Sequence, residues 1–311
     1  MFAAASKALF HGLAGIGALQ RLASRYGMAA DTGFARRFIA GETVEEAIAT
    51  ARALGGRGFG VSLDYLGESV ATLELADGAT REYLRIVDRV VAAGVERNLS
   101  LKLTQLGLDV DRATATDNLR RILEAAGAQQ FFVRIDMENS PYTDATLDIL
   151  ETVWRLGHHD VGTVIQSCLL RSGGDVERLN ALGARVRLVK GAYLEPASVA
   201  HQRMRDVDDA YVALAGRLLD ANPYPAFATH DPAMIQAVRA YAREHGIAAD
   251  RYEFQMLYGI RRDLQAALLA EGHRVRVYVP FGRQWFPYFM RRLGERPANV
   301  WFVLKGIVKD R

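Results

Sequence analysis

The sequence predicts an α/β fold, a (β/α)8 barrel, and two observations support this prediction. From residue 57 onward, short β-rich runs alternate with helical stretches, and run starts lie roughly 20–40 residues apart, about one βα unit. Several runs are almost continuously apolar, which is typical of strands covered on both faces. A doubly wound parallel sheet stays open as an alternative, because the same alternation does not by itself close a barrel.

The composition is that of an ordinary globular protein. The chain has 311 residues, of which 50% are hydrophobic, and its formal net charge of +3 is too small to predict a nucleic-acid partner. Cys168 is the only cysteine, so an intrachain disulfide and a multi-cysteine metal site are excluded, and we expect no metal. No uncharged apolar run reaches the ~20 residues that a membrane-spanning helix needs.

We expect two parts, a helical segment at residues 1–56 and the barrel at residues 57–311. Residues 1–30 are apolar and basic, which leaves two interpretations open: a helix packed on the barrel, or an amphipathic helix on a membrane surface. The first predicts a cytoplasmic protein, and the second a peripheral protein on the inner face of the membrane. Thr43 followed by Glu46 is typical of a capping box, so a helix should begin there and run to about Leu54.

Eight runs are expected to form the strands: 59–65, 99–104, 131–136, 162–167, 185–190, 225–229, 252–256 and 274–279. Helical periods separate them, such as Leu84, Val87, Val91 and Val95, which fall on one helix face.

Polar residues gather toward the ends of seven successive runs. In a barrel of this kind the chemistry takes place at the carboxyl ends of the strands, so an active site at that end requires this enrichment. The residues concerned are Lys102, Gln105, Asp136, Glu138, Gln166, Arg187, Lys190, Thr229, His230, Asp231, Glu253, Gln255 and Tyr278.

A final helix follows the eighth run and carries a pair of arginines. Pro287 suits its first turn, and helical spacing places Tyr288, Arg291, Arg292 and Glu295 on one face. Two guanidiniums beside a phenol can clamp a carboxylate or phosphate, because each forms paired hydrogen bonds. The alternative is a solvated basic face in which Glu295 pairs with the arginines.

The strand-end residues allow other interpretations. Lys190 could form the Schiff base of a barrel lyase, with the neighbouring Arg187 lowering its pKa. Lys102 and Asp136 could be a purely structural ion pair, and Arg291 with Arg292 could serve a non-catalytic anion-binding barrel. The glycines near residue 58 do not complete a dinucleotide-binding motif, so a nicotinamide site has no support.

Seven motifs, in this order along roughly residues 57–305, resemble those of the proline dehydrogenase family. They are Leu-Lys-Leu-Thr at 101–104, Arg-Ile-Asp-Met-Glu at 134–138, Val-Ile-Gln at 164–166, Arg-Leu-Val-Lys-Gly-Ala-Tyr at 187–193, Phe-Ala-Thr-His at 227–230, Glu-Phe-Gln-Met-Leu-Tyr-Gly at 253–259, and Tyr288 with Arg291, Arg292 and Glu295. The combination is far more specific than any one motif. The chain length resembles that of the bacterial monofunctional members.

The resemblance implies a distorted (β/α)8 barrel that holds FAD, with the final helix over the carboxyl ends of the strands. It implies oxidation of L-proline to Δ1-pyrroline-5-carboxylate by hydride transfer from proline C5 to FAD N5, the first step of proline catabolism. A quinone would reoxidise the flavin, and the next enzyme of the pathway would be a transient partner.

The resemblance also implies roles for individual residues. Asp136 would hold Arg291 or Lys102 in place, and Arg187 would lie near the flavin N5 and stabilise the reduced ring. The proline carboxylate would bind Lys102, Arg291 and Arg292; the ring would lie against Leu257, Tyr278 and Tyr288; and FAD would contact Met137, Gln166, Lys190, Gly191, Ala192, Thr229 and His230. Tyr278 matches the branch that oxidises proline, since the hydroxyproline branch tends to carry a smaller residue there.

Overall fold

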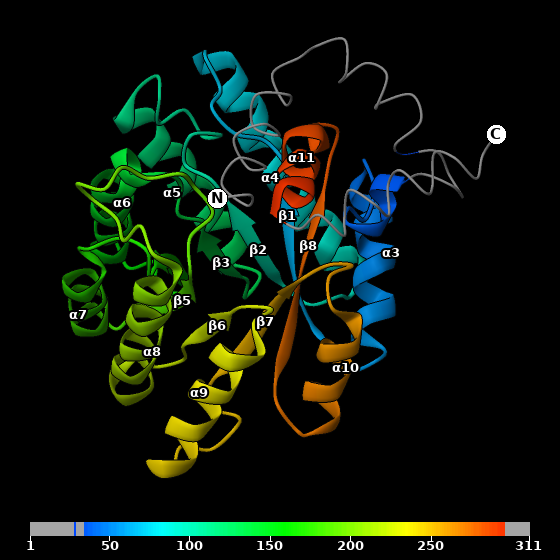
Figure 1. The fold of residues 1–311 in the computed structure, drawn as a ribbon. Coiled ribbons are helices and arrows are strands. Elements are labelled where there is room, and N and C mark those ends of the chain that lie inside the picture. Colours follow the sequence, from blue (N-terminus) through cyan, green and yellow to red (C-terminus); the bar gives the residue numbers. More distant parts are fainter. Residues whose placement is uncertain (1–27, 29–33, 296–311) are drawn as a thin grey trace.

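The computed structural model describes residue 28 and residues 34–295, and its centre is a closed barrel of parallel strands in chain order (Figure 1). β1 pairs with both β2 and β8, which closes the ring. The barrel prediction is therefore confirmed, and the doubly wound sheet is wrong. The strands are β1 (Gly60–Tyr65), β2 (Asn98–Leu101), β3 (Phe132–Ile135), β4 (Val161–Gln166), β5 (Arg185–Val189), β6 (Ala226–Ala228), β7 (Glu253–Leu257) and β8 (Val275–Phe281).

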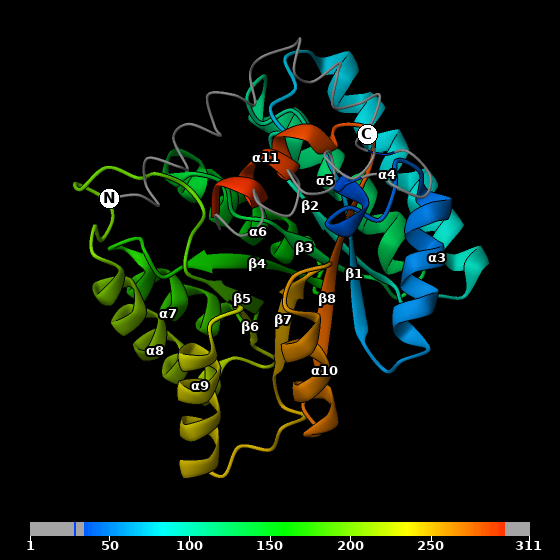
Figure 2. The same cartoon turned by 45° about the vertical axis from the view of Figure 1, so that its right-hand side comes forward.

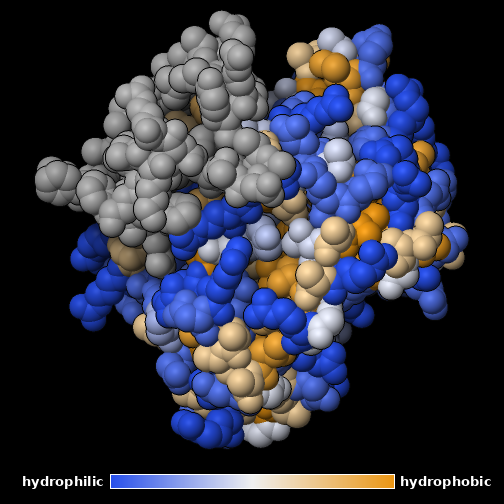
Figure 3. All heavy atoms as spheres, turned by 90° about the vertical axis from the view of Figure 1, so that its right-hand side faces the viewer, coloured by the Kyte–Doolittle hydropathy of each residue, from blue (hydrophilic) through white to orange (hydrophobic). Residues whose placement is uncertain are grey.

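Helices surround the barrel, and their buried aliphatic side chains form one core with the outward-facing residues of the strands. The outer helices are α4 (Leu73–Ala93), α5 (Arg112–Gly127), α6 (Thr143–Arg155), α7 (Ser172–Leu182), α8 (Met204–Ala221), α9 (Pro232–Glu244) and α10 (Arg262–Ala270), with short 3₁₀ turns η1 (Phe34–Arg37) and η2 (Ser140–Tyr142). Figure 3 shows an outer face on which hydrophilic residues predominate and hydrophobic residues lie in small areas.

The closing of the wall departs from a regular barrel. α3 (Val44–Gly55) precedes the first strand and packs against both β1 and β8, the place that a helix after β8 would otherwise fill. The helix that does follow β8, α11 (Trp285–Glu295), lies across the carboxyl ends of the strands (Figures 1 and 2). Its buried Trp285 and Phe289 pack with Phe38 and Ile39 in a second apolar cluster.

The capping box before α3 is present as expected. The Glu46 backbone N–H donates to Thr43 Oγ1 at 3.3 Å, and the Thr43 backbone N–H donates to Glu46 Oε2 at 3.2 Å. Glu46 also accepts a bond from Arg36 at 2.7 Å, so the same carboxylate ties η1 to α3.

The interior of the strand barrel is polar, in contrast to the outward-facing sides of the strands, which pack against the helices. Ser62, Ser100, Arg134 and Arg187 are all buried there. Gly162 makes room for Arg134, because a Cβ at this position would lie 2.2 Å from the Arg185 carbonyl oxygen and 2.9 Å from Arg134 Nη1. Charged groups this deep need partners, and Arg134 Nη1 donates to the Thr163 and Arg185 carbonyls at 3.0 and 2.6 Å.

The expected helix at residues 1–30 falls almost wholly outside the described residues. Among the helices that are described, none is both long and apolar enough to cross a membrane. The boundary between residues 56 and 57 stays a prediction, and α3 shares the core of the barrel.

The capping box makes a stability prediction. Thr43→Ala should lower the free energy of unfolding by about 1 kcal/mol, since it leaves a backbone N–H at the start of α3 without its acceptor. Urea denaturation measures the change. Thr50→Ala, inside the same helix, is the matched control and should change stability by less than about 0.5 kcal/mol; equal losses for both variants would contradict the capping role.

Candidate active site

Asp136 is the hub of a buried polar cluster at the carboxyl ends of the strands. Its Oδ1 accepts a hydrogen bond from Arg187 Nη1 at 2.7 Å, and its Oδ2 accepts one from the Tyr278 hydroxyl, also at 2.7 Å. The Arg187 guanidinium lies over the Tyr278 ring, 5.3 Å from its centroid. Burial and then the charge of Asp136 hold the pKa of Tyr278 well above its usual value, so the phenol remains a donor.

Arg187 extends from the middle of β5, not from its carboxyl end, and crosses the barrel interior. Its Nη2 donates to Ser100 Oγ on β2 at 3.1 Å. Its Nε is buried and has no hydrogen-bond partner among the described residues. Two of the three nitrogens are thus held by the protein, and the third is left for another acceptor.

Lys102 follows β2 and is paired with Asp64, a residue that the sequence analysis missed. Lys102 Nζ lies 3.8 Å from Asp64 Oδ1, and both side chains are buried. Burial alone would lower the pKa of Lys102, but the charges of Asp64 and Asp136 outweigh it and raise the pKa above its usual value. The ammonium therefore keeps its charge. Asp64 lies one residue before the end of the run at 59–65, so the strand-end rule applied to the first run would have found it.

Helix α11 carries two arginines, and Arg291 lies near Lys102, where its charge opposes that of the ammonium. Arg291 Nη1 donates to both carboxylate oxygens of Glu68, at 2.8 and 3.1 Å. Burial opposes the charge of Arg291, but Glu68 raises its pKa above the usual value. The Arg292 guanidinium lies 5.0 Å from the centroid of the Tyr288 ring, and both side chains are buried.

These contacts correct two expectations about partners. Asp136 holds Arg187 rather than Arg291, whose carboxylate partner is Glu68 in the loop after β1. The expected pairing of Glu295 with an arginine concerns a side chain outside those that the structure describes, and it stays a prediction. The idea of a solvated basic face is wrong for Arg292, which is only 8% exposed.

Tyr193 lies near Lys102 and Arg291, whose charges act on its hydroxyl. The sequence had given no role to this residue. Burial raises the pKa of Tyr193 to about 12, although the charges of Lys102 and Arg291 act in the opposite direction. The motif at 187–193 contains this residue, so the signal for it was present in the sequence.

The residues expected to contact a cofactor lie around the carboxyl ends of β3 to β7. Gln166 Nε2 donates to the Glu138 carbonyl at 2.9 Å, and Thr229 Oγ1 accepts from the Asp231 N–H at 3.1 Å. His230 Nε2 accepts a bond from the Leu257 N–H at 3.0 Å, so this ring nitrogen carries no proton and links two strand ends. Met137 is buried, and Ala192 is half-buried.

Gly191 has φ +122°, which side chains rarely adopt, and an added Cβ would lie 2.4 Å from Cys168 Sγ. Glycine is therefore required where β5 turns toward the mouth of the barrel.

Lys190 is held between two carboxylates, which argues against a Schiff base. Its Nζ lies 2.5 Å from Asp208 Oδ1 and 2.7 Å from Asp231 Oδ2. Burial opposes the charge, but the hydrogen bonds to Asp208 and Asp231 raise the pKa of Lys190. The expected lowering by Arg187 is wrong, and a Schiff base needs a neutral amine.

Glu253 does not belong to this site. It opens β7 at the amino ends of the strands, where Arg276 Nε donates to it at 2.8 Å. Its inclusion among the strand-end residues was wrong, because polar residues also mark the opposite end of the barrel.

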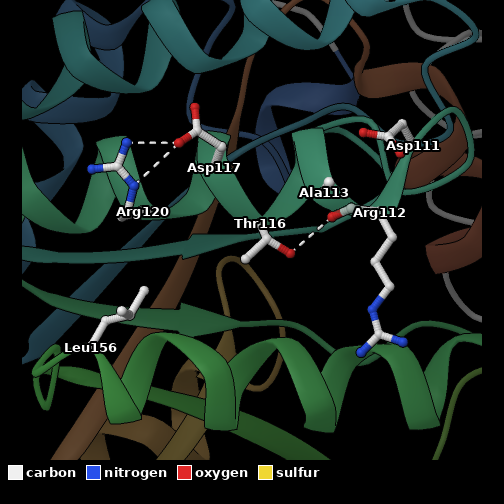
Figure 4. A pocket seen from close by; sticks show the side chains of 7 residues that line it. All are labelled: Asp111, Arg112, Ala113, Thr116, Asp117, Arg120 and Leu156. Atoms are coloured by element: carbon white, nitrogen blue, oxygen red, sulfur yellow. Dashed lines mark hydrogen bonds and ion pairs between the residues drawn. The ribbon is translucent and has the colours of Figure 1, made fainter.

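A separate surface hollow of about 620 Å³ lies between α5 and the end of α6. It is lined by Asp111, Arg112, Ala113, Thr116, Asp117, Arg120 and Leu156 (Figure 4). Its arginines are paired with carboxylates, Arg120 with Asp117 and Arg112 with Asp148, so we assign the site to the barrel mouth. Within the described residues no group of three or more His, Cys, Asp or Glu side chains could hold a metal ion.

Comparisons with known proteins identify the family. A family model described as proline dehydrogenase matches residues 47–305. The chain belongs to the proline dehydrogenase family. It is 43% identical over 279 residues to proline dehydrogenase of Deinococcus radiodurans, covering 88% of this chain and 90% of that protein. It is 40% identical over 293 residues to proline dehydrogenase 2 of Bacillus subtilis (strain 168), covering 94% and 95%.

Solved structures also match the fold. The crystal structure of proline utilization A (PutA) from Bdellovibrio bacteriovorus inactivated by N-propargylglycine has a TM-score of 0.79 and 26% identity. The match covers 84% of this chain and 32% of that one, so this chain spans about a third of the PutA chain. Membership of the proline dehydrogenase family makes the protein an oxidoreductase of proline catabolism.

The ion pair between Glu253 and Arg276, at the amino ends of the strands, leads to a prediction about stability and pH. Burial alone would raise the pKa of Glu253, but Arg276 outweighs it and the net pKa is lowered. A carboxyl group whose pKa is lower in the folded than in the unfolded protein stabilises the fold at pH values above its unfolded pKa, which is near 4.3. This contribution is lost as the pH falls through the pKa of the folded protein. Glu253→Gln should therefore cost about 3 kcal/mol of unfolding free energy at pH 7 and much less at acidic pH.

Urea denaturation at both pH values measures this difference. The exposed Glu244→Gln is the control and should change stability little at either pH. A loss for Glu253→Gln that does not depend on pH would contradict the assigned ion pair.

Proposed function

We propose that the protein is a flavoenzyme that binds FAD and oxidises L-proline to Δ1-pyrroline-5-carboxylate. The observation that carries the proposal is Arg187: a buried guanidinium held by Asp136 and Ser100, with Nε lacking a partner among the described residues. A buried N–H donor on a guanidinium suits the flavin ring, which gains negative charge when it is reduced. FAD, when bound, supplies the acceptor for the hydride that leaves proline C5.

The charges around Asp136 suit an anionic substrate. Asp136 forms an ion pair with Arg187, and its charge also acts on Lys102, which in turn lies near Arg291. A further buried guanidinium, that of Arg292, lies on the same helix as Arg291. Several cations close together suit the carboxylate of a substrate. We assign Lys102, Arg291 and Arg292 to the proline carboxylate. Charge-assisted hydrogen bonds from two guanidiniums and an ammonium would fix both the position and the orientation of this carboxylate.

Other residues shape the site around the ring. We assign Leu257, Tyr278 and Tyr288 to its walls; Tyr288 is buried, and Tyr278 is oriented by its bond to Asp136. α11 covers the strand ends, and a lid in this place excludes water from the reaction. The raised pKa of Lys102 keeps its Nζ protonated, so Lys102 acts as a cation rather than as a base.

The residues present fit a flavin nucleotide. Arg187 offers a buried donor, and Gln166, Lys190 and Thr229 offer polar groups at the ends of neighbouring strands, with Met137, Gly191, Ala192 and His230 beside them. Lys190 stays protonated between Asp208 and Asp231, so it offers the cofactor an N–H donor rather than a net positive charge.

The proposal also covers the acceptor of the flavin electrons, a partner enzyme and the location of the protein in the cell. We propose that a quinone reoxidises the flavin and that the enzyme which consumes the product is a transient partner. The bifunctional protein PutA of Escherichia coli is 30% identical to this chain over 312 residues, which cover 24% of PutA. The cytoplasm is the proposed location, with residues 1–30 as the part that would contact a membrane.

The visible spectrum of the purified protein tests the function. We expect flavin absorbance that bleaches when L-proline is added without oxygen, and no bleaching with D-proline. A colourless protein that a carbonyl substrate and borohydride label at Lys190 would support the lyase instead. A colourless protein that binds anions without turnover would support the anion-binding barrel.

The carboxylate assignment predicts the effect of removing each lid arginine. Arg291→Met and Arg292→Met should each raise KM for L-proline strongly, because loss of one cation costs about 2–4 kcal/mol in binding. Steady-state kinetics measures the change. Arg283→Met, an exposed arginine just before α11, is the matched control. Unchanged KM in both lid variants would remove them from the substrate site.

The ring-wall assignment predicts a change in specificity. Tyr278→Ser should shift the kcat/KM ratio toward hydroxyproline, because it opens space for a hydroxyl beside Asp136, which loses its phenol donor. Tyr278→Phe keeps the ring and should retain the preference for proline. An unaltered ratio in Tyr278→Ser would contradict the assignment.

A further inference from the structure

We propose that Ser100 is a positioning residue that orients Arg187 for flavin reduction. The inference rests on the proposed function, since it concerns the guanidinium assigned to the flavin. Ser100 precedes Lys102 by two residues along the chain, and its register partner on β3, Arg134, precedes Asp136 by two. Ser100 acts from the layer below Lys102 and Asp136, through one hydrogen bond.

The Arg187 guanidinium is held through both of its terminal nitrogens. Arg187 Nη1 donates to Asp136 Oδ1 at 2.7 Å, and Nη2 donates to Ser100 Oγ at 3.1 Å. A planar group fastened at two points cannot rotate in its plane without breaking a bond, so the direction of the third nitrogen is set. That nitrogen, Nε, is the buried donor without a partner among the described residues.

Asp136 alone would not set this direction. Its carboxylate also accepts the Tyr278 hydroxyl and is 13% exposed, so a single ion pair leaves the guanidinium free to pivot about Nη1. Ser100 comes from a different strand and is fully buried. Arg187 is therefore fastened to β2 as well as to the residue after β3.

The Ser100 hydroxyl has a second neighbour in the barrel interior, Ser62. Ser62 Oγ lies 3.2 Å from Ser100 Oγ. Because Ser100 Oγ accepts from Arg187, its own proton is available for Ser62. Ser62 bonds to Ser100 and not to Arg187, so Ser62→Ala removes a buried hydroxyl of the barrel interior and leaves the bond from Arg187 to Ser100 in place.

Loss of the hydroxyl has a defined consequence. In Ser100→Ala, the Nη2–H loses its protein acceptor in a buried site, and Nε is no longer held in one direction. A donor that must reorganise stabilises developing negative charge less well. The reduced flavin should therefore become harder to form, while the substrate carboxylate still meets Lys102, Arg291 and Arg292.

The experiment uses FAD-loaded wild type, Ser100→Ala, Ser62→Ala and Ser100→Thr. It measures the flavin reduction potential, and kcat and KM for L-proline. For Ser100→Ala we expect about a tenfold loss in the equilibrium constant for two-electron reduction, which is a potential about 30 mV more negative. We also expect kcat about tenfold lower and KM within threefold of wild type. Ser62→Ala should change each quantity by less than threefold, and Ser100→Thr should restore the wild-type potential.

An unchanged potential in Ser100→Ala would overturn the inference, as would an equal shift in Ser62→Ala, which would indicate a packing effect. If Ser100→Ala does not fold, Ser100→Cys keeps the volume with a weaker acceptor and should lower the potential in the same direction; a wild-type potential in Ser100→Cys would then overturn the inference. A wild-type protein whose flavin L-proline does not reduce would refute the proposed function instead, so the two failures are distinguishable.

Discussion

The ion pair between Asp136 and Arg187 is the interaction on which the site depends. Both side chains are largely shielded from water, with exposures of 6% for Arg187 and 13% for Asp136. An unpaired charge in such a place would cost several kcal/mol. The pair satisfies both charges and connects β5 to the end of β3, while Tyr278 and Ser100 each add a charge-assisted hydrogen bond to it. The result is a fixed guanidinium in a polar interior, where it needs no rearrangement to meet new negative charge.

The position of α3 makes the lid available. Because this helix, which precedes β1, fills the gap in the wall between β8 and β1, the helix after β8 does not need to cover the outside of the barrel. α11 can instead lie across the strand ends, with Trp285 and Phe289 anchored on the segment around Phe38. Arg291 of this helix is fixed by Glu68. The distortion of the barrel and the formation of the site therefore have the same structural origin.

Much of the fold and part of the site could be predicted from the sequence. Alternating apolar runs and helical periods locate the strands, because burial on both faces leaves a continuous pattern. The strand-end rule also located Lys102, Asp136 and Tyr278. It could not identify which charges pair, since partners such as Glu68 and Arg291 are far apart in the chain and only the folded barrel brings them together. Ser100 was missed for another reason: a serine inside a strand has no signal in periodicity or charge.

Lys190 shows the limit of local reasoning most clearly. Arg187, three residues earlier in the chain, suggested a lowered pKa for Lys190. Side chains an odd number of residues apart along a strand point to opposite faces, and two carboxylates from α8 and the start of α9 raise this pKa instead. The same limit applies to Glu253, whose carboxylate belongs to the amino ends of the strands because it stands first in its strand.

A double-mutant cycle on Asp136 and Arg187 tests the central claim most directly. It requires kcat/KM for L-proline in the wild type, Asp136→Asn, Arg187→Met and the combined variant. If Asp136 acts through Arg187, the combined variant should be no worse than the poorer single variant, with a coupling energy of about 2 kcal/mol or more. Losses that add within about 0.5 kcal/mol would show that the two residues act independently, and would contradict the account.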